Sequence, residues 1–275
     1  MPLLSHITWD VSPELFSLGP VTVRWYGLLF AAAFVVGYRI MYWVFKREGK
    51  PIADLEQLAI YMIVGTVIGA RLGHCLFYSP EYYLSNPIEI LMVWKGGLAS
   101  HGATVGILIA LYYYSKKKKE NLLWLLDRVV MVTAIGGALI RLGNLFNSEI
   151  VGKATDVSWA FIFTSYDSIP RHPTQLYESI AYILIFIFLF FLYKKRWKLE
   201  SHGFLFGLFL ILLFTFRFFV EFLKENQSGF EEGMTLNMGQ LLSIPFVIIG
   251  VVFLIRSRNT QSSSQLNKNK KKTSN

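Results

Sequence analysis

Four polar side chains lie close together near the end of a long apolar stretch of the chain. Arg141, Asn144, Asn147 and Glu149 fall within nine residues, after an apolar run that begins at Leu122. A charged side chain at the bilayer centre costs about 2.5–3.5 kcal/mol on insertion scales, so such groups are kept when they bind something polar. The alternative is an ion pair between Arg141 and another helix for packing alone, but that would not require the two amides and the acid.

His101 is a second candidate for chemistry, in the segment G-G-L-A-S-H-G-A-T-V-G. Small residues around a side chain let backbone and ligand approach closely. A neutral histidine could act as a general base, although a buried histidine can also be purely structural. An arginine cluster would bind a phosphate and stabilise it as it leaves, while amides and a carboxylate could hold a hydroxylated head group. These groups together indicate group transfer from a phospholipid.

The composition indicates that membrane helices position these residues. The chain has 275 residues, of which 53% are hydrophobic and 16% charged, with a mean hydropathy of +0.43. This is too apolar for a soluble domain of this size. We predict an all-α integral membrane protein with about seven transmembrane helices, near residues 20–45, 55–78, 88–115, 122–146, 176–193, 202–223 and 236–255. Lys95-Gly96-Gly97 interrupts the third, so a broken or re-entrant helix is expected there.

The distribution of basic loop residues predicts the orientation. One set of loops contains Lys46, Arg47, Lys50, Lys116 to Lys119, Lys194, Lys195, Arg196, Lys198, Arg256, Arg258, Lys268 and Lys270 to Lys272. The opposite set contains Lys153, Arg171 and Lys224. By the positive-inside rule the N-terminus is outside and the C-terminus cytoplasmic. The net charge of +9 therefore indicates topology and an anionic lipid surface, and no nucleic-acid partner is expected.

The domain organisation follows from these segments. Residues 1–255 are predicted to form a single polytopic membrane domain, in which residues 147–175 make an outside loop or cap. Residues 256–275 are basic and polar and are predicted to be a disordered cytoplasmic tail. No metal or cofactor is expected, because no His, Cys or carboxylate set has ligand spacing.

Three arginines lie late in helices predicted to run outward: Arg71, Arg141 and Arg217. Glu221 follows Arg217 by one helical turn, a spacing that suits an ion pair. We expect the three arginines to converge on an anion. The abundant anion at that depth of a membrane is a lipid phosphate.

An ordered set of motifs carries a resemblance to a known family. The motifs are V-R-W-Y-G-L near the start, G-A-R-L-G-H-C-L-F-Y-S-P-E-Y-Y at 69–83, W-K-G-G-L-A-S-H-G at 94–102, R-L-G-N-L-F-N-S-E-I-V-G at 141–152, R-H-P-T-Q-L-Y-E at 171–178, R-F-F-V-E-F at 217–222 and G-Q-L-L-S-I-P at 239–245. The set resembles the bacterial prolipoprotein diacylglyceryl transferases from about residue 20 to 255. The departures are Ala103, where the family more often has glycine, and Leu98-Ala99 in place of a Met-Ser type pair.

The resemblance implies a multi-pass transferase of the bacterial inner (cytoplasmic) membrane that acts in lipoprotein biosynthesis. Such an enzyme moves the diacylglyceryl group of phosphatidylglycerol to the lipobox cysteine of prolipoprotein signal peptides, which gives a thioether and glycerol 1-phosphate. The resemblance assigns catalytic importance to His101, Arg141, Arg217, Glu221 and Tyr26. The expected phosphatidylglycerol-binding residues are Arg141, Asn144, Asn147, Glu149, Gly152 and Arg71.

Two other classes of membrane protein fit some of the same residues. A transporter or flippase for an anionic lipid would also use buried Arg, Asn and Glu with a glycine-broken helix, although the sequence has no clear inverted repeat. An intramembrane protease would need a Ser-His or paired-Asp site, and Ser100 beside His101 has the wrong geometry for one helix. A covalent diacylglyceryl adduct on a peptide thiol would distinguish the transferase.

Overall fold

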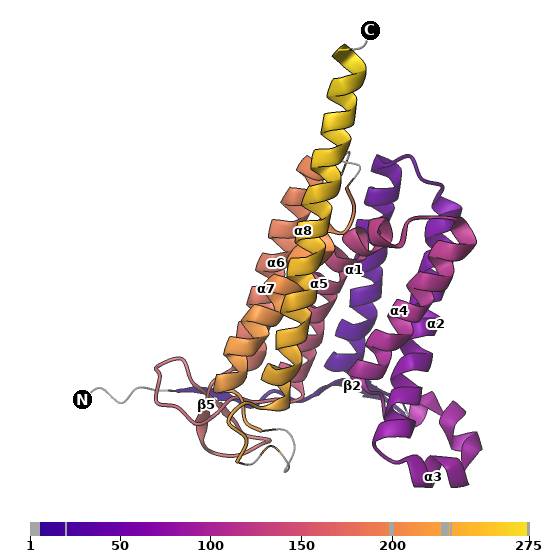
Figure 1. Cartoon of the computed structure of the whole chain (residues 1–275). Coiled ribbons are helices and arrows are strands. Elements are labelled where there is room, and N and C mark those ends of the chain that lie inside the picture. The colour runs from indigo at the N-terminus through magenta and orange to yellow at the C-terminus, as the bar shows by residue number, and fades with distance from the viewer. Residues whose placement is uncertain (1–5, 20, 198–200, 227–230, 232, 274–275) are drawn as a thin grey trace. The chain divides into compact units, whose positions relative to one another are not determined.

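The computed structural model describes residues 6–19, 21–197, 201–226, 231 and 233–273. Eight α-helices occur in this part of the chain, and they are labelled in Figure 1 where there is room: α1 (Trp25–Arg47), α2 (Ile52–Phe77), α3 (Pro80–Ser85), α4 (Ser100–Lys118), α5 (Leu122–Phe146), α6 (Thr174–Arg196), α7 (Phe204–Val220) and α8 (Met238–Thr273). Six of them, α1, α2, α5, α6, α7 and α8, are long and apolar enough to cross a membrane. A mostly helical membrane protein is therefore confirmed.

The chain divides into two compact units. One comprises Met1–Gly37 and Asp127–Asn275, and the other comprises Tyr38–Leu126. The boundaries fall within α1 and α5, so each of these helices contributes to both units. The larger unit contains the polar cluster around Arg141, and the smaller one contains His101.

In the smaller unit, α2 and α4 pack side by side with their backbones in contact (Figure 1). Gly65, Gly69 and Gly73 of α2 face Gly102 and Gly106 of α4 at helical spacing. A Cβ added at Gly69 would lie 2.4 Å from the carbonyl oxygen of Gly102, and one at Gly73 would lie 2.6 Å from the Gly102 Cα. Small residues at every fourth position permit this close approach. The approach fixes α4, and with it His101, against α2.

The predicted third span, residues 88–115, is not continuous. Residues Pro87–Leu91 and Val93–Lys95 form two 3-10 turns, η1 and η2, and α4 begins only at Ser100. Gly96 and Gly97 have φ of +84° and +70°, a backbone conformation that glycine adopts without strain. The expected break is therefore confirmed. The remaining helix, α4, ends in Lys116 to Lys118 and is not among the helices apolar enough to cross a membrane, so the count of about seven spans is not confirmed.

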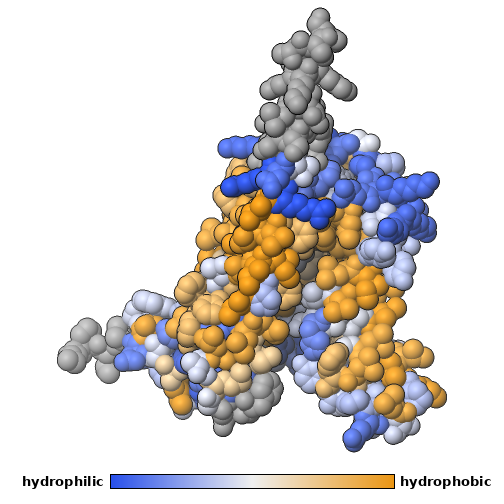
Figure 2. Space-filling model, in the orientation of Figure 1, coloured by the Kyte–Doolittle hydropathy of each residue, from blue (hydrophilic) through white to orange (hydrophobic). Residues whose placement is uncertain are grey.

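In the larger unit, α7 packs between α6 and α8, and the buried acid Asp127 caps the start of α7. Its carboxylate accepts hydrogen bonds from the backbone N–H groups of Gly203 and Phe206, each at 2.8 Å. Carboxylates at a helix start satisfy N–H groups that lack partners within the helix. Figure 2 shows hydrophobic residues over the long helices of this unit. Leu184, Phe191, Ile248 and Val252 are among the exposed ones, as expected for side chains that face lipid.

The segment between α5 and α6 folds into a small sheet with the N-terminal part of the chain. β1 (Ile7–Trp9) pairs in parallel with β4 (Phe161–Phe163), and β4 pairs antiparallel with β5 (Pro170–Arg171). Leu145, Val151, Phe161 and Phe163 form its core, against which Trp9 packs. A separate antiparallel hairpin, β2 (Glu14–Leu18) with β3 (Val21–Arg24), leads into α1. That this segment is an outside cap stays a prediction, as does the orientation of both termini.

The basic C-terminal segment continues α8 as helix to Thr273, whereas its composition predicted disorder. No glycine or proline interrupts the sequence between residues 251 and 273, so nothing in it stops a helix that the apolar part has already begun. The helix extends beyond the ends of α6 and α7 (Figure 1).

Candidate functional site

The polar cluster lies at the end of the larger unit where α5 and α7 end and α6 and α8 begin. Nη1 of Arg141 donates a hydrogen bond to Oδ1 of Asn144 at 3.2 Å, one turn further along α5. Nδ2 of Asn144 donates in turn to Oε1 of Glu149 at 2.7 Å, and Nδ2 of Asn147 donates to the same oxygen at 3.3 Å. The structure therefore joins all four residues of the predicted cluster in one network.

Glu149 reaches this network because the chain reverses sharply after α5. Ser148 and Ile150 have φ of +51° and +59°, which residues with a side chain rarely adopt. Nε2 of Gln175, a wholly buried residue of α6, donates a hydrogen bond to the backbone carbonyl of Glu149 at 2.7 Å. This bond anchors the turn to α6 and supports the strained backbone.

Arg141 also forms an ion pair across to α6. Its Nε lies 3.1 Å from Oε2 of Glu178, which is wholly buried. The same carboxylate oxygen lies 3.2 Å from Nζ of Lys224, and Oε1 accepts a hydrogen bond from the Tyr182 hydroxyl at 3.2 Å. A buried carboxylate is stable as an anion when it is paired and hydrogen-bonded in this way.

The network continues to the end of α7 through Glu221, the first residue of η3 (Glu221–Leu223). Oε1 of Glu221 lies 3.1 Å from Nζ of Lys224 and 3.5 Å from Nε of Arg217, which confirms the predicted Arg217–Glu221 ion pair. Nδ2 of Asn237 donates to Oε2 of Glu221 at 3.3 Å. A Cβ at Gly239 would lie 2.5 Å from the Glu221 carboxyl carbon, so the glycine makes room for this carboxylate.

Tyr26, at the start of α1, lies beside the cluster in the same unit. Its ring packs against Gly143 of α5, where an added Cβ would lie 2.8 Å from the Tyr26 Cδ2. The hydroxyl is close enough to Glu149 and Arg141 to interact with both electrostatically. The structure thus brings seven of the predicted site residues together: Tyr26, Arg141, Asn144, Asn147, Glu149 and, through the ion pairs, Glu221 with its partner Arg217.

Gly152 has a structural reason to be glycine, and its predicted contact with lipid stays a prediction. It is buried in an isolated antiparallel bridge with Lys224, and its backbone N–H donates to the carbonyl of His172 at 3.0 Å. An added Cβ would lie 2.4 Å from that carbonyl oxygen and 2.9 Å from the carbonyl oxygen of Leu223. The glycine therefore lets three backbone segments meet where Lys224 enters the network.

Arg71 lies apart from the hydrogen-bonded network of the cluster. It lies in the smaller unit, it is 2% exposed, and its guanidinium donates to the backbone carbonyls of four residues: Glu89, Ile90, Gly96 and Gly97, at 2.5–3.3 Å. It also lies over the ring of Tyr83, 5.0 Å from the centroid. These contacts hold the irregular segment that precedes α4, while a contact of Arg71 with a lipid phosphate stays a prediction.

His101 is exposed at the start of α4. Its ring lies 5.3 Å from the ring of Phe77 at 87°, and 5.8 Å from the ring of Tyr78. The N–H of Ala99 donates to the carbonyl of Ala70 at 2.9 Å, which ties the start of α4 to α2. Exposure beside two aromatic rings leaves the imidazole accessible to a substrate.

Ion pairs and a hydrogen bond of Arg171 hold the small sheet near the cluster. The guanidinium of Arg171 donates to Asp167, Glu225 and the carbonyl of Gly152, with shortest distances of 2.6 Å to each carboxylate. Hydrogen bonds from Arg171 lower the pKa of the Asp167 carboxyl. The loop cations of the predicted outside set, Arg171 and Lys224, are thus ion-paired groups of the structure.

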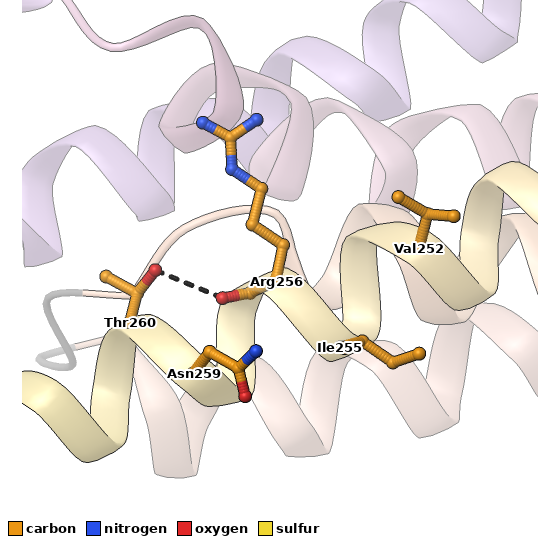
Figure 3. A pocket seen from close by; sticks show the side chains of 5 residues that line it. All are labelled: Val252, Ile255, Arg256, Asn259 and Thr260. Carbon is orange, nitrogen blue, oxygen red and sulfur yellow. Dashed lines mark hydrogen bonds between the residues drawn. The ribbon is translucent and has the colours of Figure 1, made fainter.

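A cavity of about 640 Å³ lies elsewhere in this unit, against α8. It is lined by Val252, Ile255, Arg256, Asn259 and Thr260, and the Thr260 hydroxyl donates to the backbone carbonyl of Arg256 (Figure 3). Arg256 lies about 27 Å along the helix from Met238, at 1.5 Å per residue. None of the residues that line the cavity belongs to the cluster. Among the described residues no group of three His, Cys, Asp or Glu side chains is placed to hold a metal ion.

Two residues at the centre of the network, Glu178 and Lys224, were not among the predicted site residues. Glu178 is the acid in an otherwise apolar predicted span, which by itself marks a functional position in a membrane helix. Lys224 follows Glu221 by three residues, a spacing that allows an ion pair on one helical face. Both signals are local and could have been used.

Comparison with known proteins matches residues 13–256 to the family model described as prolipoprotein diacylglyceryl transferase. A protein of Chloroherpeton thalassium named phosphatidylglycerol--prolipoprotein diacylglyceryl transferase is 54% identical over 258 residues, which is 94% of this chain and 96% of the relative. Relatives with the same name from Tolumonas auensis and Bacteroides fragilis are 48% and 49% identical, over 90% and 92% of this chain and 96% and 95% of theirs.

Proposed function

The chain belongs to the prolipoprotein diacylglyceryl transferase family, and we propose that it transfers the diacylglyceryl group of phosphatidylglycerol to the lipobox cysteine of prolipoproteins. The relatives' shared name supports both substrates. The observation that carries the proposal for the site is the hydrogen-bonded chain from Arg141 through Asn144 to Glu149. The reaction would be the first step of lipoprotein maturation in the inner membrane of a bacterium.

The proposed reaction is a substitution at the carbon of the diacylglyceryl group that is bonded to the phosphate oxygen. The cysteine thiol loses its proton to His101, because the thiolate is the nucleophile. The new S–C bond forms as the C–O bond to phosphate breaks, and the electron pair leaves with the phosphate oxygen of glycerol 1-phosphate. Arg141 and Arg217 neutralise that phosphate, and Glu221 positions Arg217.

The other predicted residues have supporting roles in this proposal. Asn144, Asn147 and Glu149 hold the hydroxyl groups of the lipid head group, and Tyr26 lies beside them. Arg71 is proposed to fix the segment that leads into α4, and hence His101, through its four carbonyl contacts. Gly152 is proposed to act by close packing, as its crowded surroundings support.

The test uses the full-length protein in liposomes that contain phosphatidylglycerol, with a peptide that carries a lipobox cysteine. We expect the peptide mass to increase by one diacylglyceryl unit and glycerol 1-phosphate to appear in equal amount. Arg141→Lys keeps the charge but loses the planar fork, and is expected to reduce transfer by about 10²-fold. Wild-type rates in both Arg141→Lys and Arg141→Ala would rule out the proposed phosphate clamp.

The base role of His101 is tested with His101→Asn over a range of pH. If His101 removes the thiol proton, high pH should relieve the loss of activity, because the acceptor then ionises without help. A loss that excess thiolate does not relieve would argue against this role. The rival function, a lipid transporter or flippase, is not favoured by the relatives. It would be supported only by movement of phosphatidylglycerol across the bilayer with no thioether product.

A further inference from the structure

Lys224 is a buried lysine that no step of the proposed reaction uses. Its side chain is 1% exposed, although the residue was expected in a solvent-facing loop. Nζ lies 3.2 Å from Oε2 of Glu178 and 3.1 Å from Oε1 of Glu221, so one ammonium group bridges two carboxylates. Burial of an ammonium is costly unless it is paired and hydrogen-bonded. Its position therefore depends on these two acids, and theirs on it.

The two acids belong to different elements, and each holds one of the proposed phosphate-binding arginines. Glu178 of α6 pairs with Arg141 of α5, and Glu221 of η3 pairs with Arg217 of α7. Lys224 thus stands in the middle of a chain of alternating charge that runs Arg141–Glu178–Lys224–Glu221–Arg217. Removal of the ammonium would leave two half-chains, in each of which the arginine is the remaining cation paired with the buried carboxylate.

The backbone of Lys224 is fixed independently of its side chain. The residue forms an antiparallel bridge with Gly152, and the N–H of Lys153 donates to the carbonyl of Leu223 at 2.7 Å. A substitution that preserves the backbone at Lys224 therefore removes the charge and leaves the surrounding loop anchored. This allows the electrostatic role of the side chain to be tested separately from the fold.

From this geometry we infer that Lys224 is a positioning residue that couples Arg141 to Arg217, so that the two arginines hold the lipid phosphate as one unit. The inference rests on the proposed function, in which both arginines contact that phosphate. A shift of about 1 Å in a positioning group can reduce a rate about 10²-fold. The ammonium of Lys224 prevents such shifts. Neither Glu178 nor Glu221 can turn toward its own arginine without losing its ion pair with Lys224.

Protonation of Lys224 gives a readout that a merely structural residue would not provide. Burial lowers the pKa of Lys224, while the facing carboxylates of Glu178 and Glu221 raise it and the guanidinium groups of Arg141 and Arg217 lower it. Arginine stays charged at every accessible pH. In Lys224→Arg the bridge should therefore survive at alkaline pH at which the lysine has lost its proton.

The experiment measures kcat/KM for phosphatidylglycerol with a lipobox peptide for wild type, Lys224→Met, Lys224→Arg and the control Lys153→Met. Lys153 follows Gly152, the bridge partner of Lys224, and its side chain is exposed. We expect kcat/KM to fall at least about tenfold in Lys224→Met, and to stay within about threefold of wild type in Lys224→Arg and Lys153→Met. Wild-type kcat/KM in Lys224→Met would overturn the inference.

Coupling between the arginines is measured with Arg141→Lys, Arg217→Lys and their combination, in both the Lys224 and the Lys224→Met background. With Lys224 present, the loss of kcat/KM in the double variant should differ by about fivefold or more from the product of the two single losses. In the Lys224→Met background the double loss should equal that product. Coupling of the same size in both backgrounds would contradict the inference.

The pH readout decides the matter if Lys224→Met is not monodisperse in detergent. The ratio of Lys224→Arg to wild-type activity cancels the ionisation of the acceptor thiol, and should rise by about threefold or more between about pH 7 and about pH 10. A flat ratio overturns the inference. If wild type forms no thioether, the proposed function fails. If wild type is active and these comparisons show no effect of Lys224, only the positioning role fails.

Discussion

The Oε2 atom of Glu178 lies 3.1 Å from the Nε atom of Arg141, across the contact between α6 and α5. Glu178 is wholly buried, so this carboxylate has no access to solvent if its partners are lost. Breaking a buried ion pair by removing one partner commonly costs about 3–5 kcal/mol, because the remaining charge stays buried without compensation. The pair therefore contributes both to the fold and to the orientation of the arginine.

Replacement of Glu178 by Gln should lower both stability and activity. The buried cations Arg141 and Lys224 would lose their common anion, and we expect a decrease of about 3 kcal/mol in the free energy of unfolding. Thermal unfolding in detergent and the transfer assay provide the measurements. Glu225→Gln is the control, because that carboxylate also pairs with an arginine but its side chain is 41% exposed. Equal effects of the two substitutions would contradict the prediction.

Gly152→Ala should destabilise the turn that carries Lys224 although it adds a single methyl group. The new Cβ would meet the carbonyl oxygens of His172 and Leu223, which are backbone atoms and cannot turn aside. We expect a loss of about 1–3 kcal/mol, with reduced transfer, from overpacking. Gly136→Ala in α5 is the control, because its Cβ would have only an ordinary contact at 3.7 Å. A fully active and stable Gly152→Ala protein would show that this packing is not required.

Arg71→Lys distinguishes a structural arginine from a lipid contact. Lysine cannot reproduce the planar fork that reaches four carbonyl groups, so the segment before α4 should lose its fixed conformation. We expect kcat to fall about tenfold, with the KM for phosphatidylglycerol nearly unchanged. Arg39→Lys, at an exposed position of α1 in the same unit, provides the control. A raised KM with normal kcat would restore the original interpretation of Arg71 as a phosphate ligand.

Asp167 should stabilise the small sheet in a pH-dependent way. Its pKa is below the ordinary 3.8, first because Arg171 donates hydrogen bonds to the carboxylate. The stabilisation is therefore fully present above about pH 3.8 and decreases as pH falls through the lower folded-state pKa. Wild type should exceed Asp167→Asn in Tm at pH 7, by the equivalent of roughly 0.2–1 kcal/mol, because the Asp167 side chain is partly exposed to solvent that screens the pair.

The Asp167 comparison requires Tm measurements from about pH 2 to about pH 7. The exposed acid Asp156 lies in the same segment and gives a matched control, Asp156→Asn. A Tm difference between wild type and Asp167→Asn that is independent of pH would contradict an electrostatic origin of the stabilisation by Asp167.

Much of the fold could be predicted because apolar length alone defines a membrane helix. Five predicted spans coincide with long apolar helices of the structure, as α1, α2, α5, α6 and α7 illustrate, and α8 contains a sixth. The third span failed because residues 88–94, which are apolar except for Glu89, contribute to 3-10 turns before the two glycines. Hydropathy does not distinguish an apolar irregular segment from an apolar helix, since both bury or expose the same side chains.

The candidate site was predictable where its contacts are local. Arg141 with Asn144, and Arg217 with Glu221, are one turn apart on their helices, so helical spacing alone places them together. Glu149 joins them only because Ser148 and Ile150 adopt left-handed conformations, which their side chains do not favour. Glu178, the ion-pair partner of Arg141, and the carbonyl partners of Arg71 lie outside the helices that carry the arginines, and no periodicity within one helix reveals them.

The glycine contact between α2 and α4 also limits how substrates can travel. Gly65 and Gly69 approach Gly102 and Gly106 so closely that even a methyl group would overlap backbone atoms. An acyl chain is no narrower than a methyl group, so neither tail of a diacylated lipid can pass between these two helices while they stay paired. The same holds for the hydrophobic segment of a prolipoprotein. Both membrane-anchored reactants must therefore travel by a route that leaves this seam closed.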